Sequence, residues 1–308
     1  MKAIPSASAA WSFNFKLTPA TITPTVRSPP FNTLDAAYQL HFYLCFKTHY
    51  LKPLFATADE HALIGNVLAD VCAREQYHLL ETEMTHDHLR LLVSLKPEQT
   101  ISRAVKMLKG NLSRQFGRAF PDQLKRHQSR TPLAEGYFAR SSGKVNLDLA
   151  RKYLDAQTSH HGYKGAWTKA LKYRNPVFKS PAFQLPHSVC ILDYHLVFAT
   201  KSRTAVFDET IAPEIFQYVM AVGRKHGFVV DRISLLPDHI HLIVEAIPSV
   251  SVNDCALALL NNTQQWMEKN FWGVLKETGA WEVWQPSFYA GTVGEYSTAQ
   301  VKKFLGGS

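Results

Sequence analysis

Two histidines separated by a single residue, His239 and His241, stand in the stretch LPDHIHLIV at residues 236–244. The aliphatic run that follows them predicts a β-strand, in which successive side chains face opposite sides. Both imidazoles would then share one face of the strand, while Ile240 packs on the other. Two imidazoles side by side on a rigid strand can hold a divalent metal ion. In a chain with 14 histidines, a chance pair at the surface or in the core is the alternative.

A related stretch lies earlier in the chain. DHLRLLV at residues 87–93 precedes DHIHLIV by 151 positions. It keeps the first histidine as His88, but Arg90 replaces the second. Arg90 cannot be a metal ligand because arginine stays protonated. His86 and His88 also form a His-x-His motif, but His86 aligns ahead of the strand, so we do not assign it a ligand role.

The order of the other patterns repeats as well. Residues 192–200 lie 152 positions after 40–48, and residues 288–304 lie 151 positions after 137–153. One net gap over more than a hundred positions indicates a duplication within the chain.

Four segments are therefore predicted. Residues 1–34 contain no Asp or Glu, are rich in Ser, Thr, Pro and Ala, and form a largely disordered extension. The two copies cover 35–157 and 187–308, and a linker with three prolines, 158–186, joins them. The predicted fold class is α+β, with largely antiparallel strands and the helices packed on one face of each sheet.

In the first copy, hydrophobic spacing predicts four strands and three helices. The strands are expected at 40–46, 77–84, 88–95 and 136–140, the helices at 57–76, 100–120 and 147–157, and a polar loop at 121–134. A further edge strand is expected at 11–16.

The last helix of the first copy carries Tyr153 and Gln157, four residues apart and hence on one helix face. The second copy has Phe304 at the position of Tyr153, and Ser308 stands where Gln157 would be matched. The first copy therefore keeps the tyrosine but lacks the histidine pair, and the second copy keeps the histidine pair but lacks the tyrosine. Taken alone, Tyr153 also fits an ordinary half-buried helix tyrosine.

The chain is strongly basic, with a formal net charge of +9. This charge indicates a polyanionic partner, most simply nucleic acid. The alternative is a soluble protein that is merely basic. Five basic residues on the helix at 100–120 are candidate DNA contacts, unless they form only a solvated face: Arg103, Lys106, Lys109, Arg114 and Arg118.

No apolar run approaches the roughly 18 residues of a membrane span, so no membrane partner is expected. The four cysteines stand far apart in apolar patterns without a CxxC motif. They indicate reduced core residues of a cytoplasmic protein.

Three motifs together resemble the single-tyrosine HUH transposases, which include insertion-sequence and REP-associated tyrosine transposases. They are Pro237-Asp238-His239-Ile240-His241, the strand Gly136-Tyr137-Phe138, and Tyr153-Leu154-Asp155-Ala156-Gln157. The resemblance covers roughly residues 37–157 and 188–304 and implies two tandem HUH domains of ferredoxin-like fold.

The resemblance also implies a chemistry. In that family the histidine pair and a glutamine hold Mg²⁺ or Mn²⁺, and the tyrosine attacks a DNA phosphate to leave a 5′-phosphotyrosine and a free 3′-OH. The family commonly works as a dimer, with the tyrosine helix of one subunit at the histidines of the other. In this chain, His239 and His241 would meet Tyr153 and Gln157 in one composite site, so that a monomeric chain acts as an intramolecular pseudo-dimer.

The second pairing would unite His88, Arg90 and Phe304, and it should be silent because phenylalanine has no side-chain oxygen with which to attack phosphorus. The expected activity is metal-dependent cleavage and strand transfer of single-stranded DNA, with hairpin ends as the partner. Two other functions stay open: a catalytically silent protein that binds DNA hairpins, and a regulator that pairs with an active transposase.

Overall fold

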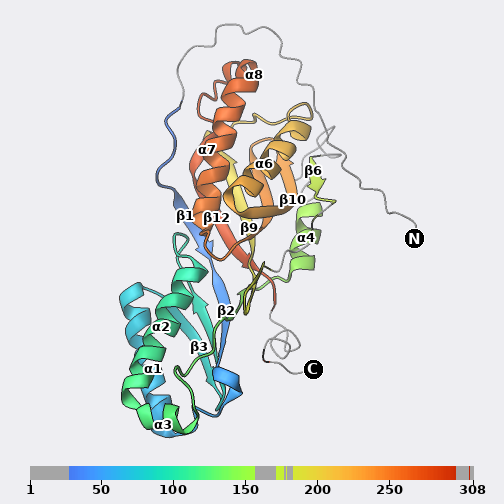
Figure 1. Cartoon of the computed structure of the whole chain (residues 1–308). Helices are drawn as coiled ribbons and strands as arrows, with labels where there is room; N and C mark the ends of the chain where they lie inside the picture. Colours follow the sequence, from blue (N-terminus) through green and yellow to red (C-terminus); the bar gives the residue numbers. More distant parts are fainter. Residues whose placement is uncertain (1–27, 157–170, 177, 179–182, 296–304, 306–308) are drawn as a thin grey trace, which may run out of the picture.

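The structure is a computed structural model that describes residues 28–156, 171–176, 178, 183–295 and 305 (Figure 1). The first copy contains β1 (Asp35–Gln39), β2 (His41–Lys47), η1 (His49–Leu51), α1 (Ala58–Glu75), β3 (His78–Met84), β4 (His88–Ser94), α2 (Ile101–Ala119), α3 (Pro121–Arg126), β5 (Phe138–Ser142) and α4 (Leu147–Asp155). Between the copies lie β6 (Lys172–Arg174) and β7 (Phe183–Leu185). The second copy contains β8 (Ser188–Ile191), β9 (Asp193–Thr200), η3 (Lys201–Arg203), α6 (Ala212–His226), β10 (Phe228–Leu236), β11 (His239–Ala246), α7 (Val252–Asn270), α8 (Trp272–Thr278) and β12 (Trp284–Val293).

Hydroxyl side chains cap three of the long helices. Thr57 caps α1 in a capping box with Glu60, and Ser251 caps α7 in a capping box with Asp254. Each box satisfies backbone donors that the first helical turn leaves open. Thr100 caps α2 through the backbone N–H of Arg103.

The strands form two six-stranded sheets, in the orders β3-β4-β2-β5-β8-β7 and β1-β12-β9-β11-β10-β6. Most neighbours are antiparallel, but two pairs are parallel, and both join the copies. β1 of the first copy pairs with β12 of the second, and β8 of the second copy pairs with β5 of the first. The copies therefore exchange strands, and each sheet contains residues of both.

The predicted α+β class, with two repeated units, is confirmed. In the second copy the long helices cover one face of the sheet, and Ile240, Leu242 and Val244 of β11 point into the core beneath them. Figure 1 shows α1, α2 and α3 gathered at one end of the molecule and α6, α7 and α8 at the other, with α4 lying in the lobe of the second copy.

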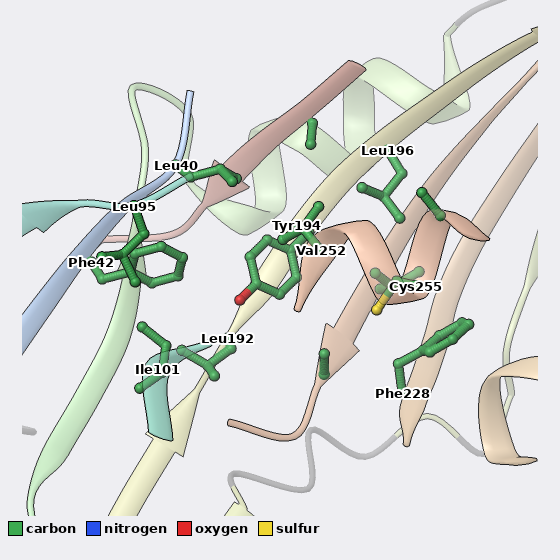
Figure 2. Close-up of a cluster of buried hydrophobic side chains, with 14 of the residues drawn as sticks. Leu40, Phe42, Leu95, Ile101, Leu192, Tyr194, Leu196, Phe228, Val252 and Cys255 are labelled. Atoms are coloured by element: carbon green, nitrogen blue, oxygen red, sulfur yellow. The ribbon is translucent and has the colours of Figure 1, made fainter. Parts of the chain in front are cut away.

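A continuous apolar core joins the copies where the strands exchange. Figure 2 shows Leu40, Phe42, Leu95 and Ile101 of the first copy beside Leu192, Tyr194, Leu196, Phe228, Val252 and Cys255 of the second. The rings of Phe42 and Tyr194 meet edge to face, with centroids 6.2 Å apart. The boundary thus has the hydrophobic character of an obligate interface.

Three parts of the chain differ from the sequence expectation. The expected polar loop at 121–134 begins with the helix α3, because Pro121 suits a first helical turn and Leu124 is buried. The expected linker supplies two short edge strands, β6 on β10 and β7 on β8. The last residues of the expected disordered extension contact α7 of the second copy, where Phe31 exchanges backbone hydrogen bonds with the Asn261 amide.

The structure also bears on the expected core cysteines and on the expected absence of a membrane span. The four cysteines are buried and unbonded. Within the described part of the chain, no helix has the length and apolarity that a membrane crossing requires. The expected strand at 11–16 and the positions of Gln157 and Phe304 lie outside the described residues.

The backbones of the two copies cross at close range at Gly143. Its backbone N–H donates to the carbonyl oxygen of Gly294 at 2.9 Å, and the nearby Ser141 hydroxyl donates to the carbonyl oxygen of Val293 at 2.6 Å. A Cβ atom on Gly143 would lie 2.0 Å from the carbonyl oxygen of Thr292. Only glycine allows the backbones to approach this closely.

We expect Gly143→Ala to lower the free energy of unfolding by roughly 1–3 kcal/mol, because the methyl group must push the crossing strands apart. Gly65→Ala in α1 is the control: nothing lies within 4 Å of its added Cβ, so the variant should gain about 0.5–1 kcal/mol in helix propensity. Urea unfolding measures both. Equal stability of Gly143→Ala and the wild type would contradict the close crossing.

Candidate active site

The histidine pair lies on β11, between β9 and β10. His239 and His241 face away from the core that Ile240 and Leu242 enter, as strand alternation requires. Their rings have centroids 5.1 Å apart, and the residues are only 2% and 6% exposed. Two imidazoles thus stand together at a nearly dry position on the sheet.

Helix α4 of the first copy covers this face of the second copy's sheet. Ala150 and Leu154 pack against Ile243 of β11 and Val293 of β12. The same turn of the helix brings the ring of Tyr153 to 6.1 Å from that of His241, edge to face. Tyr153 is 42% exposed, so its ring is open to solvent while it touches the histidines.

Ion pairs anchor α4 to the strands beneath it. Arg151 Nε donates to Asp231 Oδ2 at 2.7 Å, and Asp231 is nearly buried. At the end of the helix, the Asp155 carboxylate accepts from Arg232 of β10 and from Arg174 of β6. Partly buried, hydrogen-bonded pairs of this kind favour one docking position over others.

Two buried acids lie farther along the same face. Asp193 of β9 stands opposite Glu245 of β11, and the two are 2% and 0% exposed. Burial raises the pKa of Asp193 to about 6, although the positive charges of Arg140 and Arg151 act against this shift. Both arginines belong to the first copy, so charges of opposite sign meet across the boundary.

Each histidine of the pair is held through Nδ1. Asp238 Oδ1 lies 2.6 Å from Nδ1 of His239, and Nε2 of His195 lies 3.0 Å from Nδ1 of His241. Burial lowers the pKa of His195 to about 4, so this ring is neutral near pH 7 and Nε2 can accept a hydrogen bond. With Nδ1 of each ring hydrogen-bonded in this way, Nε2 is the nitrogen that would coordinate a metal.

These donors fit a metal ion. No group of three His, Cys, Asp or Glu residues suited to a metal exists within the described ranges. The protein ligands at hand are the two imidazoles, and the carboxylate behind His239 is the outer partner that metal-binding histidines usually have. Two imidazoles leave open positions for phosphate oxygens and water. The expected third ligand, Gln157, lies outside the described residues.

The corresponding position of the first copy is occupied differently. His88 Nδ1 contacts Asp87 Oδ1 at 2.6 Å, as in the second copy. Arg90, however, donates to both oxygens of Glu83 at 2.8 Å, which puts an internal ion pair where a metal would need a ligand. Leu305, next to the expected Phe304, packs against an apolar cluster that includes Tyr43.

Of the five basic residues expected to contact DNA, Lys109 is used inside the fold. Its Nζ donates to the carbonyl oxygens of Ala134 and Gly136, and burial lowers its pKa to about 8. Arg103 is exposed but pairs with Glu75 at 3.0 Å. The other three side chains, those of Lys106, Arg114 and Arg118, are exposed on α2.

Sequence reasoning missed three residues at the site. His195 and Tyr289, whose rings lie 6.0 Å apart, reach it from β9 and β12. Extending the strand alternation from Asp193 to His195 would have put His195 on the histidine face. Arg203, which pairs with Asp238, gave no signal, because the contact depends on a turn of the chain.

The chain is similar in sequence to known transposases. The sequence model of the family described as IS200-like transposases matches the chain twice, over residues 36–157 and 188–306. The ISDra2 transposase TnpA of Deinococcus radiodurans is 26% identical over 114 residues, which is 37% of this chain and 81% of that protein. The transposase for insertion sequence element IS200 of Salmonella typhimurium is 24% identical over 116 residues, 38% of this chain and 75% of that protein.

A solved structure of a Deinococcus radiodurans R1 protein, itself assigned as a transposase, covers 39% of this chain and 92% of its own, with a TM-score of 0.33 and 22% identity. The double match of the family model confirms the tandem repeat expected from the 151-residue period.

The pKa of His195 gives a prediction for stability in the absence of divalent metal. The unfolded ring takes up a proton near pH 6.5 and the folded ring only near pH 4, so the free energy of unfolding should fall as the pH is lowered between these values. His195 should contribute at most roughly 3 kcal/mol to this fall. The raised pKa of Asp193 acts in the opposite direction, stabilising the fold as the pH falls from about 6 toward 3.8.

Comparing the wild type with His195→Gln isolates the histidine, because Asp193 is common to both. Urea unfolding in EDTA should show the wild type gaining stability over the variant as the pH rises from 4 to 7. A stability difference that does not change with pH would show that His195 is not held neutral by burial.

Proposed function

Because the chain belongs to the IS200-like transposase family, we propose that it cleaves and joins single-stranded DNA at one composite active site. Tyr153 is the nucleophile, and His239 and His241, with Gln157, hold Mg²⁺ or Mn²⁺. The observation that carries this proposal is the 6.1 Å approach between the rings of Tyr153 and His241, which come from different copies.

The reaction is an in-line displacement at phosphorus. The Tyr153 oxygen forms a bond to the phosphorus as the bond to the 3′ oxygen breaks, which gives a 5′-phosphotyrosine and a free 3′-OH. The phenol proton leaves to solvent, and the departing 3′ oxygen takes up a proton. A bound Mg²⁺ or Mn²⁺ would polarise the phosphate and offset its developing charge. The covalent intermediate conserves the phosphodiester for rejoining.

The surrounding residues prepare this step. Asp238 and His195 fix the orientation of the two metal-binding imidazoles through Nδ1. The Arg151–Asp231 and Asp155–Arg232 pairs hold α4, and therefore Tyr153, over the histidines. A reacting group that is positioned in advance loses less entropy on reaching the transition state.

We further propose that the chain is an intramolecular pseudo-dimer with one working site. The strand exchange of β1 and β8 and the joint core support this reading. The Arg90–Glu83 ion pair supports a silent second site. DNA hairpins are the proposed substrates, in keeping with the positive charge of the chain.

A second candidate is a protein that binds DNA hairpins without cleaving them. The exposed basic side chains of Lys106, Arg114 and Arg118 on α2 favour it, because they suit DNA binding that needs no metal. Covalent capture of DNA separates the two functions, since only the first forms a bond to the protein.

Tyr153→Phe should abolish the denaturation-resistant adduct with labelled single-stranded hairpin DNA and Mg²⁺ or Mn²⁺, because the variant loses only the attacking oxygen. DNA binding should stay near that of the wild type. The adduct is detected by denaturing electrophoresis.

Tyr289→Phe is a matched control, because Tyr289 has the same 42% exposure and its ring lies 6.0 Å from His195. This variant should keep the adduct. Loss of the adduct in Tyr289→Phe and its retention in Tyr153→Phe would assign the nucleophile to the second copy and overturn the composite site.

His239→Ala should also abolish the adduct and weaken Mn²⁺ binding by roughly 10-fold or more, because it removes a metal ligand. His88→Ala makes the same change at the corresponding position of the first copy and should leave both nearly intact. Metal binding is measured by titration with Mn²⁺. If His88→Ala stops cleavage while His239→Ala does not, the first copy acts alone.

A further inference from the structure

The turn after β9 has an unusual backbone. Ser202 and Arg203 have φ values of 55° and 56°, in the left-handed region that residues other than glycine rarely adopt. The same turn follows β2 of the first copy, at Tyr50 and Leu51. Such a backbone costs on the order of 1–3 kcal/mol for each residue and persists only when its surroundings enforce it. The shape of the turn is thus common to both copies, while the side chain that it presents differs.

In the second copy the turn brings a guanidinium to the histidine pair. Arg203 Nε donates to Asp238 Oδ2 at 2.8 Å, and Nη2 lies 3.4 Å from Nδ1 of His239. The other oxygen of the same carboxylate, Oδ1, lies 2.6 Å from Nδ1 of His239. One carboxylate therefore holds both a candidate metal ligand and a permanent positive charge.

The guanidinium is anchored but still reachable. Its side chain is 53% exposed, whereas Asp238 is only 14% exposed. Arginine presents five N–H donors, and the contacts of Nε with Asp238 and of Nη2 with His239 use two of them, so donors on the Nη edge remain for a second oxyanion. Arginine forks recognise phosphate through two parallel hydrogen bonds.

In the first copy the cation next to this turn, Lys52, is engaged elsewhere: its Nζ donates to the backbone carbonyl oxygen of His127. Leu51 stands at the position of Arg203, and Asp87 is engaged by Thr85 and His88. Of the two equivalent aspartates in the described chain, Asp238 is the one paired with an arginine, and it lies at the site that also has the histidine pair and the nearby Tyr153. This coincidence indicates a role in the reaction of that site rather than in the fold that the copies share.

We propose that Arg203 binds a phosphate of the single DNA strand at the composite site, beside the histidine pair, through its Nη atoms. The proposal rests on the proposed function, which supplies the DNA. Arg203 holds the phosphodiester in place for attack, and its charge stabilises the extra negative charge of the transition state. Asp238 sets the direction of the guanidinium in the same way that it sets that of His239.

Two substitutions separate phosphate binding from the tie to Asp238. In Arg203→Gln the amide nitrogen occupies the place of Nε, so a donor to Asp238 remains while the charge and the fork are lost. Arg203→Leu, which installs the residue of the first copy, removes both. Arg224→Leu is the control: it makes the same change at an exposed position of α6, on the helical side of the sheet away from the histidines.

The first measurement is binding of a labelled random-sequence single-stranded DNA pool in EDTA, over a range of salt concentrations. Each phosphate contact contributes a slope of about −0.7 to the plot of log affinity against log salt. Arg203→Gln and Arg203→Leu should each lose about 0.7 of that slope, and Arg224→Leu should keep it. An unchanged slope in Arg203→Gln, or an equal loss in Arg224→Leu, would overturn the proposal.

The second measurement is the rate of adduct formation with Mg²⁺, together with Mn²⁺ affinity. Arg203→Gln should slow the adduct by roughly 100-fold, as the loss of one transition-state donor does, and bind Mn²⁺ like the wild type. If Arg203→Gln forms the adduct at the wild-type rate, Arg203 does not act on the phosphate. If the wild type itself forms no adduct, the proposed function fails, and the salt slopes still decide whether Arg203 binds DNA.

Discussion

The exchange of parallel strands between the two copies is the constraint on which the rest of the structure depends. β1 pairs with β12 and then continues directly into β2, so one stretch of chain crosses from one sheet to the other. β8 and β5 make the reciprocal pairing. Neither sheet is complete without residues of both copies. The same crossing, at Gly143, sends α4 onto β10 and β11 of the second copy.

This arrangement gives the two halves unequal roles. The first copy supplies α4 with Tyr153, and arginines that meet the buried acids of the second copy. The second copy supplies the histidine strand and the cation of Arg203. At the reciprocal position Arg90 is bonded to Glu83, an arrangement suited to stability rather than to metal binding. Because the copies are joined in one chain, a single complete site is enough for the proposed chemistry. The second site therefore need not keep a histidine pair or a tyrosine.

The sequence predicted the family from its motifs and the tandem repeat from the period of 151 residues. It predicted the α+β class from the alternation of the strands and the spacing of the helices, which are local patterns. Alternation also predicted that His239 and His241 share a face, and they do. The exchange of β1 and β8 could not be read in this way, since a parallel pairing joins residues far apart in the chain and leaves no local trace. Arg203 escaped notice for a related reason: its position depends on a left-handed turn of residues other than glycine.

The central claim is that one chain builds one site from both copies, and mixing two inactive variants tests it most directly. The full chain with Tyr153→Phe keeps the histidines, and the full chain with His239→Ala keeps the tyrosine. We expect their mixture to form no covalent DNA adduct under conditions in which the wild type forms one, because α4 of each chain already docks on the histidine strand of the same chain. An adduct restored by mixing would show that the tyrosine serves the histidines of another chain, which contradicts the account.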